Sequence, residues 1–138
     1  MVEGYDYEIT ESSPGLWRWV IARPDRVPAG LVNAFVCFET KAEVAQDFAI
    51  HASGHLDQSG RWVLPRAHLK LLVQAITVPC EACKDHYFGD VCWHERDADG
   101  CNWGVSTIRG PGNHDECMAC LEPAAIQLRR RYSVPEEG

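Results

Sequence analysis

Two short cysteine motifs, Cys80-Glu81-Ala82-Cys83 and Cys117-Met118-Ala119-Cys120, dominate the second half of this 138-residue chain. In each motif two residues separate the cysteines, so a turn of the backbone presents both sulfur atoms on one side. Two such pairs supply the four thiolates that complete a tetrahedral shell around one zinc ion. The sequence therefore predicts a zinc site formed by Cys80, Cys83, Cys117 and Cys120.

A shell of four thiolates has no open position for water, so zinc held in this way is structural rather than catalytic. The alternative interpretation is that the two pairs are buried thiols or disulfides. The chain has seven cysteines, and residues 1–6 are acidic and lack the apolar region of a secretory signal. We therefore expect a cytoplasmic, reducing environment, where thiols bind metal more often than they form bridges.

The residues between and after the motifs predict a hairpin followed by a helix. Residues 91–94 and 102–108 favour strands, and Asp97-Ala98-Asp99-Gly100 is typical of a turn between them. After the second motif, apolar residues recur at helical spacing: Leu121, Ala125, Leu128 and Tyr132. The order of cysteine turn (the knuckle), hairpin and helix resembles a treble-clef zinc finger over residues 80–132. This resemblance implies the same four cysteine ligands.

A second group of metal-ligating residue types lies in and after the predicted hairpin. Together with the two motifs, its spacing resembles a RING-type cross-brace in which Gly104 stands where an eighth ligand is needed. One hypothesis is a second zinc site formed by Cys92, His94, Cys101 and His114. The alternative is that Cys92 and Cys101 are small apolar residues that face each other across the hairpin.

The first half of the chain predicts a small three-stranded antiparallel sheet covered by a helix. Polar and apolar residues alternate over residues 5–10, and residues 16–22 and 33–39 also favour strands. Thr40 and Glu43 form a capping-box pattern, which predicts that a helix begins there. The sequence therefore indicates an α+β fold.

This first half resembles the small YegP-like bacterial domains, in which a three-stranded sheet precedes one helix. Trp17-Arg18-Trp19 and Thr40-Lys41-Ala42 carry the resemblance, which spans residues 5–53 and implies a fold without an activity. Apolar spacing predicts a second helix over residues 65–77. The expected organisation is a β-β-β-α subdomain, a connecting segment and a zinc module, at residues 1–58, 59–79 and 80–138.

The charge of the chain bears on its partners. The net charge is −7, and an acidic surface repels nucleic-acid phosphates. Basic residues nevertheless gather in two stretches, and they would form a nucleic-acid interface if folding placed them on one face. They are Arg61, Arg66, Lys70, Arg129, Arg130 and Arg131. No apolar run approaches the length of a membrane span.

Catalysis has weaker support in the sequence. HNH nucleases place an activating histidine in a similar frame of two CxxC motifs, and His94 or His114 could take that role. The segment Leu121-Glu122-Pro123-Ala124 lacks the further metal ligand of that family, which an activated water would require. A degenerate HNH-like nuclease is therefore a secondary hypothesis.

The interpretation that the sequence favours is a non-enzymatic, zinc-stabilised protein that binds a protein partner as an adaptor or inhibitor. A small acidic protein of this kind could also be one that a phage or mobile element encodes. Tryptophans would mark the binding surface wherever they are exposed. The chain has five: Trp17, Trp19, Trp62, Trp93 and Trp103.

Overall fold

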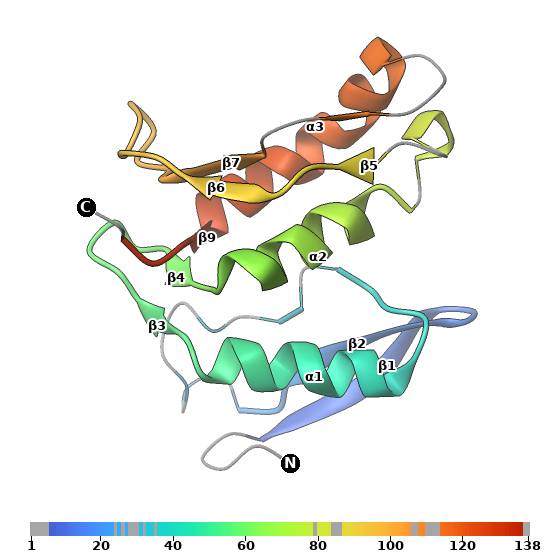
Figure 1. The fold of residues 1–138 in the computed structure, drawn as a ribbon. Helices are drawn as coiled ribbons and strands as arrows, with labels where there is room; N and C mark the ends of the chain where they lie inside the picture. Colours follow the sequence, from blue (N-terminus) through green and yellow to red (C-terminus); the bar gives the residue numbers. More distant parts are fainter. Residues whose placement is uncertain are drawn as a thin grey trace. The chain divides into compact units, whose positions relative to one another are not determined.

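The computed structural model of the chain has an α+β fold, in which helices accompany short antiparallel strands (Figure 1). It divides into two units, Met1–Trp62 and Val63–Gly138, and the second unit includes the predicted helix of the connecting segment. The structure describes residues 6–23, 25, 27, 31, 33–34, 36–78, 80–83, 87–105, 108–109 and 114–136, with the backbone alone at 87–88, 108–109 and 114.

The first unit opens with a β-hairpin. β1 (Tyr7–Ser13) pairs antiparallel with β2 (Leu16–Ile21), and Ile9 lies opposite Trp19. The turn between the strands contains Gly15, whose φ of +81° is a left-handed conformation that glycine adopts without strain. The first two predicted strands are therefore confirmed.

The prediction of a third strand over residues 33–39, by contrast, is wrong for those of its residues that the structure describes. Trp17 and Phe38 form an isolated antiparallel bridge, with backbone hydrogen bonds of 2.7 and 2.8 Å. A regular ladder from this bridge would place Val36 opposite Trp19. The Trp19 carbonyl oxygen instead accepts from the Ala34 N–H at 3.2 Å. Ala34 therefore stands where Val36 would stand in a regular ladder, which is a shift of two residues, so the pairing is interrupted.

Helix α1 (Lys41–Ala52) begins where the capping pattern predicts. The Thr40 hydroxyl accepts a hydrogen bond of 3.1 Å from the Glu43 N–H and donates one of 2.9 Å to the Glu43 carboxylate. Phe48 is buried on the face that packs on the hairpin, and its ring stacks on Tyr7 with 3.9 Å between centroids. Local capping and apolar burial therefore both favour this helix.

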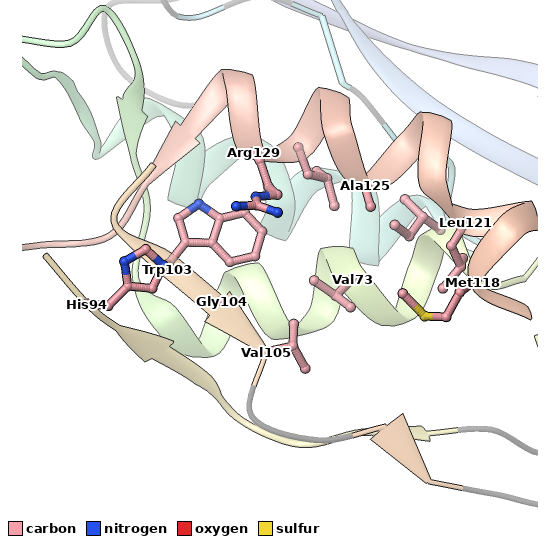
Figure 2. A pocket seen from close by; sticks show the side chains of 11 residues that line it. Val73, His94, Trp103, Gly104, Val105, Met118, Leu121, Ala125 and Arg129 are labelled. Carbon is pink, nitrogen blue, oxygen red and sulfur yellow. The ribbon is translucent and has the colours of Figure 1, made fainter. Parts of the chain in front are cut away.

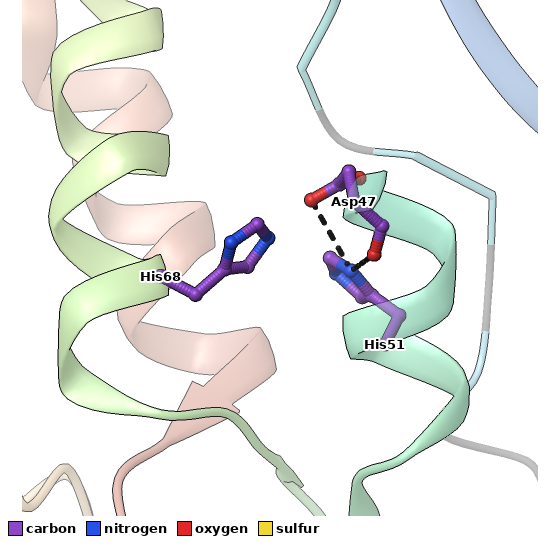
Figure 3. A group of neighbouring side chains, drawn as sticks. All are labelled: Asp47, His51 and His68. Atoms are coloured by element: carbon purple, nitrogen blue, oxygen red, sulfur yellow. Dashed lines mark hydrogen bonds and ion pairs between the residues drawn. The ribbon is translucent and has the colours of Figure 1, made fainter. Parts of the chain in front are cut away.

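The same helix also buries two polar residues that the apolar pattern did not predict. Asp47 Oδ2 accepts a hydrogen bond of 2.7 Å from the indole N–H of Trp19. His51 Nδ1 lies 2.8 Å from the Asp47 carbonyl oxygen and 3.3 Å from its carboxylate (Figure 3). The His51 carbonyl oxygen accepts from the Trp62 indole N–H at 2.8 Å. These bonds join β2 and the last residue of the unit, Trp62, to α1.

Replacing Asp47 by alanine should lower the free energy of unfolding by about 2 kcal/mol, because the buried Trp19 indole N–H would lose its acceptor. Urea denaturation of the purified chain measures this change. Gln46→Ala, at an exposed position of the same helix, is the control and should change stability by less than about 0.5 kcal/mol. Equal stability of wild type and Asp47→Ala would contradict the prediction.

Between α1 and the next helix, β3 (His55–Leu56) and β4 (Trp62–Val63) flank a turn in which Gly60 has a φ of +86°. In the second unit, α2 (Arg66–Ile76) buries the apolar face that its spacing predicts: Leu69, Leu72, Val73 and Ile76. A 3-10 helix, η2 (Glu81–Cys83), follows it. β5 (Tyr87–Phe88) pairs antiparallel with β8 (Ile108–Arg109).

The predicted hairpin of the second unit is confirmed. β6 (Val91–Trp93) pairs antiparallel with β7 (Trp103–Val105). Asp97 closes the turn between them, because its Oδ1 accepts hydrogen bonds of 2.9 and 3.1 Å from the N–H groups of Asp99 and Cys101. The Asp97 carboxylate thus adds two hydrogen bonds to the backbone bonds of this turn, from the Gly100 N–H to the Asp97 carbonyl oxygen and from the Asp97 N–H to the Cys101 carbonyl oxygen.

The chain ends with α3 (His114–Arg131) and the short strand β9 (Tyr132–Ser133). Asn102, which is fully buried, holds the residues that follow: its amide donates to the Val134 carbonyl oxygen at 2.8 Å and its Oδ1 accepts from the Val134 N–H at 3.0 Å. The Asn102 side chain therefore bonds both backbone groups of Val134, as a neighbouring strand would, and attaches this last segment to the hairpin.

Candidate functional site

The four cysteines of the two CxxC motifs come together in the second unit. Disulfides join them crosswise, Cys80 to Cys120 and Cys83 to Cys117, with Cα–Cα distances of 6.0 and 4.7 Å. Each disulfide therefore links the knuckle at residues 80–83 to helix α3 and does not close one motif on itself. We call these residues the four-cysteine cluster.

Local backbone geometry explains why the sulfur atoms meet. Cys117 and Cys120 lie three residues apart on α3, so their side chains share a face of the helix. In the knuckle the Cys83 N–H donates to the Cys80 carbonyl oxygen at 3.0 Å, which closes a tight turn. Three of the side chains are buried and Cys120 is exposed. The cluster is therefore accessible from one side.

The disulfides differ from the thiolates that the zinc prediction assumes, because a bridged sulfur carries no charge and does not ligate zinc. The donor set nevertheless has the chemistry of a structural zinc site, with four cysteines from a turn and a helix. Thiolates about 2.3 Å from zinc lie about 3.8 Å from one another, which reduced side chains could reach by rotation from a Cα–Cα distance of 6.0 Å. The reduced residues fit zinc, and zinc itself stays a prediction.

The second predicted metal site does not form among the residues that the structure describes. Cys92 is exposed on β6 and lies opposite Gly104, whereas Cys101 is fully buried. The two cysteines therefore do not face each other, either as ligands or as apolar neighbours. The ligand atoms of Cys92, His94 and Cys101 do not gather into a group in this part of the chain. The side chain of His114 lies outside the described residues.

The basic residues of the predicted nucleic-acid interface have different surroundings. Arg61 is buried. Lys70 donates to the Asp90 carboxylate at 2.8 Å, and this hydrogen bond and charge lower the pKa of Asp90. Arg129 donates to the Asp97 carboxylate at 3.1 Å. Two of the cations are therefore matched by carboxylates of this chain. The other three lie on α2 and α3: Arg66, Arg130 and Arg131.

The tryptophans belong mainly to the core, and all five are among the described residues. Trp19, Trp62 and Trp103 are buried, and each indole N–H donates a hydrogen bond. Trp17 and Trp93 are half-buried. Since none is fully exposed, the tryptophans do not mark a binding surface.

A pocket of about 360 Å³ lies between α2, β7 and α3 of the second unit (Figure 2). We call it the helix–hairpin pocket. Its walls are mostly apolar and include Val73, Ile76, Val105, Met118, Leu121 and Ala125. His94 and Arg129 also line it, and Figure 2 shows both beside Trp103, at the end away from Met118. Sequence reasoning missed this pocket, although Met118 stands inside the second cysteine motif.

The charged end of the pocket has a defined hydrogen-bond arrangement. Contact with the Cys101 thiol and then the charge of Asp97 raise the pKa of Arg129, so its guanidinium stays cationic. His94 Nδ1 donates to the Glu95 carbonyl oxygen at 2.6 Å. Because that carbonyl can only accept, the Nδ1 atom carries a proton, and Nε2 is left for a ligand. The pocket therefore offers apolar walls and one cationic end.

Sequence reasoning also missed a pair of metal-ligating side chains in the first unit. Asp47 and His51 bring a carboxylate and an imidazole within 3.3 Å of each other on α1 (Figure 3). They stand four residues apart beside Val44 and Phe48, so a polar pair within an apolar stripe was the signal that could have revealed them. His68, also drawn in Figure 3, lies on α2 of the second unit.

Comparisons with known proteins returned nothing: no family model, curated protein or solved structure matches this chain. The site is therefore interpreted from its own chemistry. Across the described residues, no helix combines the length and the apolar character needed to cross a lipid bilayer.

The Asp97 carboxylate makes the stability of the hairpin turn depend on pH. Burial acts to raise its pKa, but hydrogen bonds from the Cys101 and Asp99 N–H groups and the charge of Arg129 outweigh burial and bring the pKa below the usual 3.8. A carboxylate whose pKa is lowered by folding stabilises the protein above its unfolded pKa, and this effect is lost as the pH falls through the folded value.

Asp97→Asn should therefore lower the melting temperature near neutral pH, and the difference from wild type should shrink as the pH falls below about 4. Thermal unfolding followed by circular dichroism from pH 7 to pH 3 measures this. Glu122→Gln, an exposed position on α3, makes the same charge change and is the control. A difference that stays constant over this range would contradict the prediction.

Proposed function

We propose that the chain is a non-enzymatic binding protein whose second unit, stabilised at the four-cysteine cluster, holds a protein partner as an adaptor or inhibitor. The observation that carries this proposal is the crosswise linkage of the knuckle to α3, across sequence separations of 40 and 34 residues. Linkage over such distances restricts the unfolded chain strongly and so stabilises the folded unit.

The second unit needs this stabilisation because its strands are short. β5, β6, β7 and β8 have two or three residues each, and paired strands of this length are not stable by themselves in water. The linked four-cysteine cluster supplies the stability that these short strands lack. With zinc bound, the four thiolates would leave the metal no position for a reacting water. The cluster would then stabilise a scaffold for binding and would not be a catalytic centre.

The cluster has two chemical forms that tie the same elements together. In an oxidising compartment the four thiols form disulfides, as in this structure. In the cytoplasm, where thiols stay reduced, they would lose their protons and bind zinc. We place the working protein in the cytoplasm, with one zinc ion held by Cys80, Cys83, Cys117 and Cys120.

The two alternative functions have less support. Lys70 and Arg129 are each paired with a carboxylate, and the net charge of −7 opposes a phosphate backbone. His94, the candidate nuclease histidine whose side chain is described, lines a mostly apolar pocket and uses its Nδ1 on the Glu95 carbonyl oxygen. The first arrangement therefore disfavours nucleic-acid binding, and the second disfavours cleavage of a phosphodiester.

Protein purified under reducing conditions should contain about one zinc ion per chain. Cys117→Ser should lower the zinc content severalfold, because a hydroxyl replaces one thiolate ligand. Cys92→Ser, which changes an exposed free cysteine of the same unit, should leave the zinc content unchanged. Elemental analysis measures the metal, and a chelator should lower the melting temperature of the wild type. Reduced protein that folds without metal would contradict the zinc assignment.

The binding function is tested by comparing captures with matched bait proteins under reducing conditions with zinc. Wild type and Cys92→Ser should retain the same host protein, and Cys117→Ser should not. The retained protein, identified by mass spectrometry and purified, should bind wild type directly in calorimetry. The proposed function would be overturned if wild type captured no more protein than Cys117→Ser does, or if wild type cleaved DNA with Mg²⁺ or Mn²⁺.

A further inference from the structure

We infer that the helix–hairpin pocket is the docking site for a short peptide segment of the partner, in which one large apolar side chain stands next to a carboxylate. This inference rests on the proposed binding function and names the partner chemistry of the same unit. Its basis is the composition of the pocket, which joins apolar walls to one cationic end.

The walls of the pocket select an apolar side chain. Val73 and Ile76 come from α2, Val105 from β7, and Leu121 and Ala125 from α3 (Figure 2). A polar group placed among these side chains would lose its water without gaining a hydrogen bond. An aliphatic or aromatic side chain would gain the free energy of removing its surface from water.

The cationic end selects a negative group beside that side chain. Arg129 and His94 lie at the same end of the pocket, next to Trp103. Arg129 donates to Asp97 and contacts the Cys101 thiol, and its side chain is still 51% exposed, so a further carboxylate can approach the guanidinium. The chain as a whole has a net charge of −7, which would repel an acidic run. A single carboxylate next to an apolar residue fits both observations.

The size and the rim of the pocket favour a peptide as its occupant. About 360 Å³ is near the lower end of the range for ligand pockets, so there is room for an anchoring side chain and its neighbours. Met118 lines the pocket and is still 37% exposed, so its flexible thioether lies where a partner backbone would pass. Methionine at such a position adapts its shape to the surface of a bound protein.

Docking at this place would also depend on the four-cysteine cluster. Met118 stands between Cys117 and Cys120, and Leu121 follows directly on the same helix. The linkage that holds the start of α3 to the knuckle therefore also positions this wall of the pocket. Helix α3 therefore connects the stabilising cluster to the binding surface.

Methyl NMR tests the inference directly, because the chain has two methionines, Met1 and Met118. Protein labelled with ¹³C at the methionine methyl groups is titrated with two tripeptides of sequence acetyl-Gly-Gly-Phe, one with a free C-terminal carboxylate and one with an amide. The Met118 signal should shift and the Met1 signal should not. The carboxylate peptide should bind about tenfold tighter than the amide, because it adds a charge-assisted contact.

Variants test the charged contact and the apolar contact separately. Arg129→Gln should bring the two peptides to within about twofold of each other, and Arg130→Gln, the neighbouring position outside the pocket, should keep the tenfold preference. If Arg129→Gln is unfolded, the loss of the wild-type preference at high salt tests the same charge contact. Ala125→Trp, which fills the pocket, should abolish the Met118 shift. Gln127→Trp, an exposed position on the same helix, should preserve it.

Three outcomes would overturn the inference: no shift of Met118 with either peptide, equal affinity for both in the wild type, or tighter binding of decanoate than of the peptide. The last would identify a fatty carboxylate as the occupant. Zinc content is measured on the same samples. A metal-free protein whose Met118 still reports the tenfold preference would support the docking site while contradicting the zinc assignment.

Discussion

The attachment of the knuckle to helix α3 is the constraint on which the second unit depends. Strands of two or three residues cannot hold a fold by themselves, and the elements that surround them come from both sides of a long intervening segment. The cysteines close that segment by joining Cys80 to Cys120 and Cys83 to Cys117. Whether the link is a disulfide or a shared metal ion, the same two elements are fixed to each other.

The first unit is held by a different kind of constraint. Its helix buries a carboxylate and an imidazole, and a buried polar group destabilises a fold unless it is hydrogen-bonded. The Asp47 carboxylate meets this requirement by accepting from the indole N–H of Trp19, and the His51 imidazole meets it through Nδ1, which lies 2.8 Å from the Asp47 carbonyl oxygen. The backbone carbonyl oxygen of His51 in turn accepts from the indole N–H of Trp62. These tryptophans thus serve the interior of the unit and are not available as a binding surface.

The proposed function follows from the way scaffold and surface share one helix in the second unit. Met118 and Leu121 line the helix–hairpin pocket from the turns of α3 that carry Cys117 and Cys120. At the other end, Arg129 is held by the same carboxylate, Asp97, that closes the hairpin turn. Each end of the pocket is therefore positioned by an interaction that also stabilises the fold, which gives a preorganised surface for a partner.

The sequence by itself determined the features that depend on neighbouring residues: the capped start of α1 at Thr40, the apolar face of α2 and the hairpin turn at Asp97. Local hydrogen bonds and helical periodicity specify these without help from the rest of the chain. Only the tertiary structure decided the rest. The crosswise pairing of the cysteines, the interrupted pairing near Phe38 and the walls of the pocket arise from contacts between segments far apart in the sequence, whose geometry no local pattern encodes.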